Sequence, residues 1–381
     1  GTGASYAQDQ TFTMGSIGIT LYAIWSNTTT GALDTDFDSD GVVTTSVGAS
    51  SSIIQALAIQ DDGKIVAAGY SWEGPIQCFT LSRYNSNGSV DTIFGTDGVV
   101  TTIPVGSLSS SIQALCIQGD GKIVAAGYTD NGPNTYFALV RYNTDGTLDT
   151  TFGSGGIVTT QVDLLSSIED AVFALAIQGD GKIVAAGYTY NGANVKFAVV
   201  RYNTDGSLDT SFDTDGIVAT PVGAGAEDIA YALCIQGDGK IVVAGYSSNG
   251  ANNDFALIRY NSDGSLDTDF DTDGIITTPV GSGTDKAYAL CIQGDGKIVA
   301  AGYSSNGVND DFTLVRYNSD GSLDTDFDLD GIATTPVGSG TDRAYDLCIQ
   351  DDGKIVTAGS SHNGTDNDFA LVRYNTDGTL D

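Results

Sequence analysis

The chain has 381 residues, of which 41% are hydrophobic and 17% charged, so it can bury a substantial core and does not have the composition of a disordered protein. Its formal net charge of −33 excludes sequence-independent binding to nucleic acid, which needs a basic surface. No run of about 18 apolar residues occurs, so the sequence predicts no membrane-spanning segment.

The N-terminal segment, residues 1–27, is expected to be a β segment separate from the main domain at 28–381. The chain begins with Gly1-Thr2-Gly3 rather than with a Met or a signal segment. We therefore expect a processed product or an excerpt of a longer protein, in which 1–27 is the remnant or linker of a preceding module.

Residues 28–381 are dominated by one repeated unit. The phrase Asp-Gly-Lys-Ile-Val returns every 57 to 60 residues, with its lysine at Lys64, Lys122, Lys182, Lys240, Lys297 and Lys354. In the fourth copy, strand composition is found at 231–236, 240–246, 254–260 and 274–278, and the Asp-Gly between the first two is typical of a hairpin turn. No window has sustained helical periodicity, so each unit is expected to form a four-stranded antiparallel sheet.

The second and third strands of each unit are apolar on both faces, as Phe255-Ala256-Leu257-Ile258 illustrates. Such a sheet must be covered on both sides, and without helices the neighbouring sheets must cover it. Sheets that stack face to face around an axis form a β-propeller. The sequence therefore predicts an all-β, six-bladed β-propeller of four-stranded antiparallel blades over residues 28–381, with an open solenoid as the alternative.

The fourth strands begin one unit early, at 41–45, and the last of them is at 331–335. The last unit, 344–374, therefore lacks a fourth strand of its own. We expect strand 41–45 to pair there and close the ring, which would remove the free sheet edges that invite aggregation.

Several phrases of the unit resemble a known repeat family. They include Phe-Ala-Leu-Val-Arg-Tyr-Asn, Ala-Ile-Gln-Gly-Asp-Gly-Lys-Ile-Val-Ala-Ala-Gly and Leu148-Asp-Thr-Thr-Phe-Gly-Ser-Gly-Gly156. They resemble the delta-sixty repeat of bacterial surface and secreted proteins, which implies a propeller in a surface setting but no particular activity. Separately, 11–14 and 19–25 resemble the end of a Listeria–Bacteroides-type β-repeat, which implies a preceding surface module.

Twelve of the 15 basic residues occupy two repeated positions: the six lysines above and Arg83, Arg141, Arg201, Arg259, Arg316 and Arg373. An arginine inside an apolar strand needs an acidic acceptor, and bidentate pairing suits its planar side chain. The expected acceptors are either the recurring aspartates Asp91, Asp149, Asp209, Asp267 and Asp324 or the aspartates of the Asp-Gly turns. We interpret the repeated arginines as structural.

Three acidic turns match the Asp-x-Asp-x-Asp-Gly opening of calcium-binding loops. They are Asp36, Asp38 and Asp40; Asp269, Asp271 and Asp273; and Asp326, Asp328 and Asp330. The glutamate that completes such loops is absent, since Val47, Val280 or Val337 stands at its position. Calcium is the one cofactor that the sequence suggests, and an ordinary solvated acidic turn is the alternative.

The loops that follow the second strand vary most between copies. In a propeller they share one face, so Trp72, Tyr136, Tyr190 and Lys196 are expected to gather on one face of the first three blades. Exposed aromatic residues can form a contact surface for protein or glycan ligands. Ordinary variation between loops is the alternative.

The single histidine, His362, lies in a polar loop of the last copy, and the sequence marks no nucleophile or carboxylate as its partner, which argues against a histidine-dependent triad. We therefore predict a non-enzymatic, extracellular structural or adhesive module of a large surface protein or extracellular polymer, whose partners are other surface modules or copies of itself. The first alternative is a propeller that binds glycans or other ligands through the variable loop face. The second is a propeller hydrolase or lyase, although the 48 acidic residues do not single out one carboxylate pair.

Overall fold

The computed structural model describes residues 12–14, 19–21, 33–48, 50–163 and 169–381. Within these ranges every regular element is a β-strand, which confirms the prediction of an all-β fold. None of the described segments is a helix long and apolar enough to cross a membrane. Most of the predicted N-terminal unit 1–27, including its boundary with the main domain, lies outside the described residues.

Each sequence repeat folds into consecutive antiparallel strands. The first repeat consists of β3 (Ser52–Ile59), β4 (Ile65–Glu73), β5 (Ile76–Tyr84) and β6 (Val99–Thr102), and the second of β7 (Ser109–Ile117), β8 (Ile123–Asp130), β9 (Thr135–Tyr142) and β10 (Ile157–Thr160). The third consists of β11 (Glu169–Ile177), β12 (Ile183–Tyr190), β13 (Val195–Tyr202) and β14 (Ile217–Thr220). The fourth contains β15 (Asp228–Ile235), β16 (Ile241–Ser248), β17 (Asn253–Tyr260) and β18 (Ile275–Thr278).

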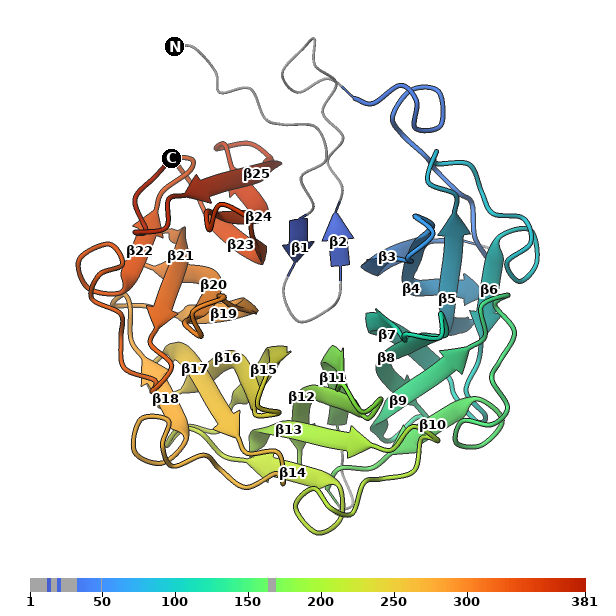
Figure 1. Ribbon diagram of the computed structural model, residues 1–381, viewed down its shortest axis with the longest axis horizontal. Coiled ribbons are helices and arrows are strands. Elements are labelled where there is room, and N and C mark those ends of the chain that lie inside the picture. The colour runs from blue at the N-terminus through green and yellow to red at the C-terminus, as the bar shows by residue number, and fades with distance from the viewer. Residues whose placement is uncertain (1–11, 15–18, 22–32, 49, 164–168) are drawn as a thin grey trace.

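The fifth repeat contains β19 (Asp285–Ile292), β20 (Ile298–Ser305), β21 (Asp310–Tyr317) and β22 (Ile332–Thr335). The last contains β23 (Asp342–Ile349), β24 (Ile355–His362) and β25 (Asn367–Tyr374). Two short strands, β1 (Phe12–Met14) and β2 (Ile19–Leu21), pair with each other, and β1 also pairs with β23. Figure 1 shows the sheets arranged around a central axis, with the first strand of each repeat nearest the axis and the fourth at the rim. This is the arrangement of a β-propeller.

The hydrophobic core lies between neighbouring sheets. One cluster, for example, combines Phe197 and Phe212 of the third repeat with Leu233 and Ile241 of the fourth, all fully buried. Equivalent clusters lie between the other successive repeats. The sheets of the second to fifth repeats are therefore covered on both faces, as the apolar pattern of their strands predicts.

A β-bulge interrupts the first strand of every repeat. In β15 the pairing with β16 shifts between Ala230 and Ala232, so that Tyr231 has no partner in the register. Gly245 lies opposite, and a Cβ on it would stand 1.9 Å from the carbonyl oxygen of Ile229, so only glycine fits. A bulge redirects the side chain of its extra residue, and the same shift recurs in β3, β7, β11, β19 and β23.

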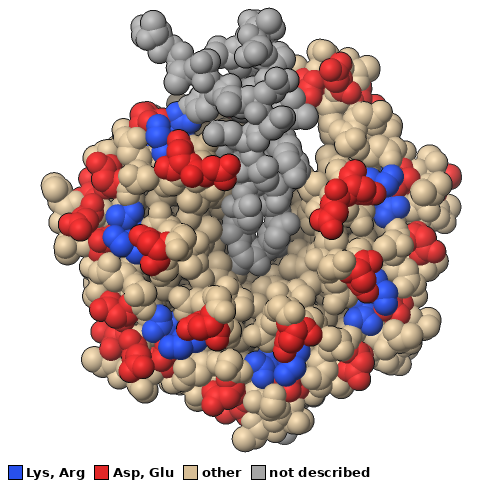
Figure 2. Space-filling model, viewed as in Figure 1, with Lys and Arg blue, Asp and Glu red and all other residues tan. Residues whose placement is uncertain are grey.

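The repeated arginines are structural, as predicted, although the pairing differs in detail. Arg259 and Asp267 are 5% and 3% exposed, and Arg259 Nε donates to Asp267 Oδ2 at 2.5 Å. The ammonium of Lys240 lies 2.8 Å from the same oxygen. The bond is not bidentate, because the Nη1 atom of Arg259 donates instead to the carbonyl of Ser319 in the next repeat. Figure 2 shows these basic groups recurring around the ring beside carboxylates.

The predicted closing strand is not formed. Residues 41–45 adopt no strand, and the sheet of the last repeat ends at β25. Phe369 and Leu371 of β25 are 102% and 70% exposed, whereas Phe312 of the preceding repeat is fully buried. Thr45 instead accepts a hydrogen bond from the Tyr84 hydroxyl at 2.8 Å, which keeps the segment beside the first repeat.

Candidate functional site

Four aromatic side chains occupy the bulge position of successive innermost strands. They are Phe173 of β11, Tyr231 of β15, Tyr288 of β19 and Tyr345 of β23, which we call the inner aromatic arc. Their ring centroids follow one another at 4.9, 4.9 and 5.5 Å. Because bulges place these rings beside the axis, they form a nearly continuous aromatic surface over four repeats.

A second set of tyrosines supports the arc from the second strands. Tyr188, Tyr246 and Tyr303 each follow the glycine that faces the bulge, and their ring centroids lie about 6 Å from those of Phe173, Tyr231 and Tyr288 respectively. The Tyr246 hydroxyl donates to Glu227 Oε1 at 2.6 Å. Burial, together with this carboxylate, raises the pKa of Tyr246 far above its ordinary value, so Tyr246 is a neutral hydrogen-bond donor at any physiological pH.

Two cations lie beside the arc. The Lys286 ammonium is 3.8 Å from the centroid of the Tyr246 ring, and the Arg343 guanidinium is 4.7 Å from that of Tyr303. Lys286 and Arg343 occupy the same position of β19 and β23, two residues before the bulge. Arg343 also pairs with Asp310 at 2.7 Å.

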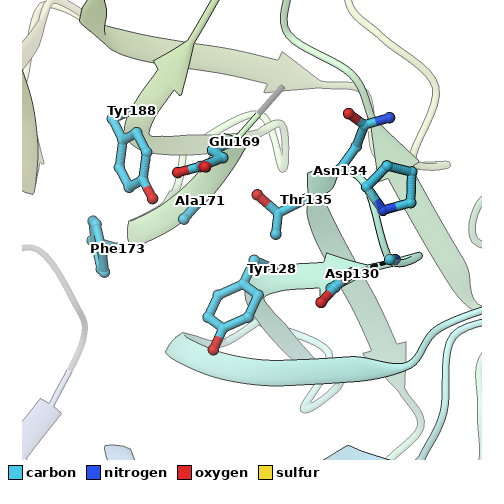
Figure 3. Close-up of a pocket in the computed structure, with 10 residues that line it drawn as sticks. Tyr128, Asp130, Asn134, Thr135, Glu169, Ala171, Phe173 and Tyr188 are labelled. Carbon is cyan, nitrogen blue, oxygen red and sulfur yellow. Dashed lines mark hydrogen bonds between the residues drawn. The ribbon is translucent and has the colours of Figure 1, made fainter. Parts of the chain in front are cut away.

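The arc begins in a pocket of about 350 Å³ between the second and third repeats. Figure 3 shows the rings of Tyr128, Phe173 and Tyr188 on one side of this pocket, and Asp130 and Glu169 also in its wall. Asp130 ends β8 and its carboxylate accepts the backbone N–H of Gly132. Glu169 begins β11 and is exposed. The pocket thus combines aromatic faces with two carboxylates from different repeats.

A buried carboxylate, that of Asp170, anchors the start of β11, which carries Glu169 in the pocket wall. Asp170 is fully buried; its Oδ2 accepts the N–H of Val162 at 2.9 Å, and its own N–H donates to Thr135 Oγ1 at 2.9 Å. Burial raises the pKa of Asp170 to about 6. Asp228, Asp285 and Asp342 accept N–H groups of the loop before their strands in the same way, so Asp170 is an anchor shared by several repeats.

The residues proposed from the variable loops lie outside this pocket. Tyr136 accepts hydrogen bonds from Asn131 and Asn134, and Lys196 approaches Asp163 at 4.0 Å. Trp72 is the penultimate residue of β4 and Tyr190 the last residue of β12, and both are partly buried. Among the described side chains, no hydrogen bond or ring contact links Trp72, Tyr136, Tyr190 and Lys196 to one another. Their role as a ligand surface stays a prediction.

The acidic turns do not form a cluster of ligands. In the described part of the chain, no group of three or more acidic, histidine or cysteine side chains lies close enough to hold a metal ion. Asp40, Asp273 and Asp330 each accept the N–H group two residues further on, which stabilises the turn. Calcium binding by these turns stays a prediction.

Sequence reasoning missed the arc, because its rings lie inside apolar strands and were counted with the core. A signal was present: the bulge residue is Gln55 or Gln113 in the first two repeats and aromatic in the other four. A position that alternates between glutamine and tyrosine within an apolar strand is not a core position. The recurrent Ala-Gly-Tyr of the second strand marks the glycine that faces the bulge.

Six stretches of the chain match one family, described as a domain of unknown function (DUF5122) beta-propeller. They are residues 60–94, 118–152, 178–212, 236–270, 293–327 and 350–381, which together make up more than half of the chain. The protein is thus a repeat β-propeller by sequence as well as by structure. It belongs to the DUF5122 β-propeller family.

Solved structures with a similar fold include several enzymes. A gluconolactonase from Xanthomonas campestris is 15% identical, with a TM-score of 0.37, and the match covers 78% of this chain and 86% of the enzyme. An ulvan lyase is 11% identical, with a TM-score of 0.46 and coverage of 84% and 80%. An aldose sugar dehydrogenase from Streptomyces coelicolor is 12% identical, with a TM-score of 0.44 and coverage of 87% and 98%. No curated protein matches the sequence.

These neighbours contradict the prediction of a non-enzymatic structural or adhesive module. That prediction rested on the near-identity of the repeats and on the absence of an obvious catalytic motif, yet the neighbours named above are enzymes built on the same kind of fold. At these identities the likeness concerns the fold alone. Any activity must therefore be argued from the residues of this chain.

Proposed function

We propose that the protein is a carbohydrate-active propeller, which binds a polysaccharide along the inner aromatic arc and hydrolyses it in the pocket between β8 and β11. One observation carries the proposal: the pocket brings Asp130 and Glu169 beside the rings of Tyr128, Phe173 and Tyr188. A pair of carboxylates flanking the scissile bond is the common requirement of glycoside hydrolysis.

Carbohydrate suits this surface for a chemical reason. A sugar ring carries C–H groups on its faces and hydroxyl groups at its rim, so it packs on aromatic rings while its hydroxyls reach polar groups or water. The arc presents rings at intervals of 4.9 to 5.5 Å over four repeats. An extended chain of sugars is therefore a better occupant than a single small molecule.

In the proposed reaction the two carboxylates act as acid and base. One of Asp130 and Glu169 gives a proton to the leaving glycosidic oxygen, and the other removes a proton from the attacking water. The glycosidic C–O bond breaks and a new C–O bond forms to the water oxygen. Asp170 takes no part in proton transfer; it positions Glu169 through its bonds to Val162 and Thr135.

The test is depolymerisation of a panel of neutral and uronate-containing polysaccharides, followed by the appearance of reducing ends. Glu169→Gln and Asp130→Asn are each expected to lower kcat by about 100-fold or more, since general acid–base groups contribute on that order. Glu73→Gln, the same change on the first repeat, is the control and should leave kcat unchanged. No cleavage of any polymer, or full activity of Glu169→Gln, would contradict the proposal. An unsaturated product would assign a lyase instead.

Binding without cleavage is the second candidate. It is favoured by the length of the arc, because Tyr231, Tyr288 and Tyr345 extend well beyond the pocket that holds the carboxylates. Under this alternative Tyr288→Ala weakens polysaccharide binding, and Glu169→Gln changes nothing that can be measured. The depolymerisation assay separates the two.

We further propose that the ring has six blades and closes between the last repeat and the segment 41–45. The Tyr84–Thr45 bond supports this, because Tyr142 makes the same bond to Thr102 on the fourth strand of the preceding repeat. Thr45 therefore lies against the first repeat as Thr102 lies against the second, which is the position expected for a fourth strand of the blade before the first repeat. Closure would bury Phe369 and Leu371 of β25, and Ile54 of β3, which is 56% exposed.

An extracellular location, and membership of the delta-sixty group of bacterial surface proteins, belong to the same proposal. They rest on the resemblance of the repeat phrases and agree with a polysaccharide substrate. Calcium at the acidic turns is part of it as well, and a melting curve recorded with and without a chelator tests it. Glycans are the proposed partners.

A further inference from the structure

Three basic residues stand outside the repeated lysine and arginine positions: Lys196, Lys286 and Arg343. The twelve repeated ones face the buried or partly buried aspartates that hold each repeat together, as Lys240 and Arg259 do with Asp267. Two of the three additional cations, Lys286 and Arg343, lie side by side on adjacent innermost strands, next to the arc. In a chain with a net charge of −33, two cations outside the repeated ion pairs are an unusual feature of this surface.

Lys286 makes no direct ion pair with a described carboxylate. In the described part of the chain it has no carboxylate oxygen within 4.0 Å, whereas all six repeated lysines have one. The nearest acidic group along the arc, Glu227, is bound to the Tyr246 hydroxyl. Burial lowers the pKa of Lys286, and although the charge of Glu227 acts in the opposite direction it does not compensate for the lost water.

Arg343 retains the capacity to bind a second anion. Its Nε and Nη2 both contact the same oxygen of Asp310, at 2.8 and 2.7 Å, and its side chain is 39% exposed. A guanidinium has five N–H donors, so this single carboxylate oxygen does not use them all. Arg343 therefore offers free donors beside Tyr303, and Lys286 offers its ammonium beside Tyr246. Those two rings lie 6.0 Å from Tyr288 and Tyr231 of the arc, respectively.

We propose that Lys286 and Arg343 form a subsite for an acidic sugar residue, whose carboxylate or sulfate ester they bind while its ring packs on Tyr288 or Tyr345. This inference rests on the proposed function and narrows its substrate to acidic polysaccharides. The physical reason is that a charge pair in a partly desolvated place is stronger than one in water. Lys286 would gain this pairing without losing an existing ion pair.

The subsite also accounts for how an acidic polymer could approach so acidic a protein. At long range the net charge of −33 repels a polyanion, and salt screens that repulsion over about 10 Å. Lys286 and the free donors of Arg343 supply positive groups at the arc that no repeated ion pair uses. Acidic polymers should therefore bind there and not along the rim, where each basic group already has its aspartate.

The experiment measures equilibrium binding by calorimetry with two matched pairs of polymers: polygalacturonate and its carboxyl-reduced form, and a sulfated galactan and its desulfated form. The wild-type protein is expected to bind at least one acidic polymer about tenfold more tightly than its neutral counterpart. The pair that shows the preference identifies carboxylate or sulfate as the recognised group. Lys286→Gln and Arg343→Gln should each reduce that preference at least fivefold without weakening the binding of the neutral form.

Lys182→Gln is the matched control, because it removes a lysine of a repeated position that pairs with Asp209 and is not part of the arc, and it should leave the preference unchanged. Lys286→Arg keeps the charge and should keep most of the preference; melting curves of all variants establish that they are folded. Equal binding of the acidic and neutral forms, or an undiminished preference in folded Lys286→Gln, overturns the subsite while leaving the proposed function intact. Absence of binding to all four polymers overturns both.

Discussion

Arg259→Ala gives a direct measure of how strongly the repeats are tied together. The substitution removes the bond to Asp267 and the bond to the Ser319 carbonyl of the next repeat, and it leaves a carboxylate that is 3% exposed with only Lys240 as a charged partner. Breaking a buried ion pair by removing one member costs about 3 to 5 kcal/mol. Because Lys240 still neutralises Asp267, we expect about 3 kcal/mol, the lower end of this range.

The corresponding change in melting temperature follows from the size of the chain. Unfolding entropy amounts to about 2.1 cal/mol/K per residue, or about 0.8 kcal/mol/K for 381 residues. A loss of about 3 kcal/mol therefore lowers Tm by roughly 4 °C if the ring unfolds as one unit. Calorimetry of Arg259→Ala measures the shift, and Lys196→Ala, which breaks the loose contact with Asp163 at 4.0 Å, is the control with a shift of about 1 °C or less.

The pH dependence provides a second signature of the same pair. Burial by itself would raise the pKa of Asp267, but hydrogen bonds from Lys240 and Arg259 outweigh it and hold the pKa below its ordinary value of 3.8. A carboxyl whose pKa is lowered on folding stabilises the protein above the unfolded pKa, and this stabilisation is lost as the pH falls through the folded value. The gap between wild type and Arg259→Ala should therefore shrink below about pH 4. A Tm within 1 °C of wild type at neutral pH would refute the structural role of the arginine.

Two further predictions concern Asp346 and the closure of the ring. Asp346 replaces the alanine that other repeats carry at this place, such as Ala289, and burial raises its pKa to about 6. Its contribution to stability is therefore lost as the pH rises from about 4 to 6. In urea titrations Asp346→Ala should be more stable than the wild type at pH 8, by at most about 3 kcal/mol, and this gain should vanish near pH 4. An equal gain at both pH values would assign it to packing instead. Ring closure predicts that Thr44→Cys and Ala370→Cys together form an intrachain disulfide, because Thr277 and Ala256 are paired in the equivalent place of the fourth repeat. Each single variant is the control, and crosslinks formed only between chains would show strand exchange between copies.

Most of the fold could be predicted because the same strand and turn pattern occurs in every copy of the repeat. The Asp-Gly turns, the doubly apolar strands and the repeated Arg and Asp positions each point to stacked four-stranded sheets, and strands β3 to β25 follow that pattern. The position of residues 41–45 could not be predicted in this way. A strand this short forms few hydrogen bonds, and its position depends on contacts with both the first and the last repeat. The order of the repeats in the sequence does not show whether these residues bind to Tyr84, as Thr45 does, or also pair with β25.

The candidate site was harder to predict, since it depends on bulges. An alternating pattern assigns Tyr231 and Tyr288 to a face of their strands, and a one-residue shift in register changes that face. The sequence instead predicts sites in the variable loops and the acidic turns, where aromatic and acidic residues stand out from the repeat. The carboxylates of the pocket, Asp130 and Glu169, come from different repeats and become neighbours only when the sheets stack.

The bulge separates two requirements that usually compete within a β-strand: packing against the neighbouring sheets and presenting a variable side chain to the axis. Substitution at Ala230 or Ala232 alters a packed interface, but the residue between them can be glutamine, phenylalanine or tyrosine while the flanking pairs keep their register, as Gln113, Phe173 and Tyr231 demonstrate. The side chains that line the axis can thus be substituted one repeat at a time, at positions that do not belong to the packed interfaces between sheets. A designer who wished to redirect this protein to a new ligand would begin with those few positions.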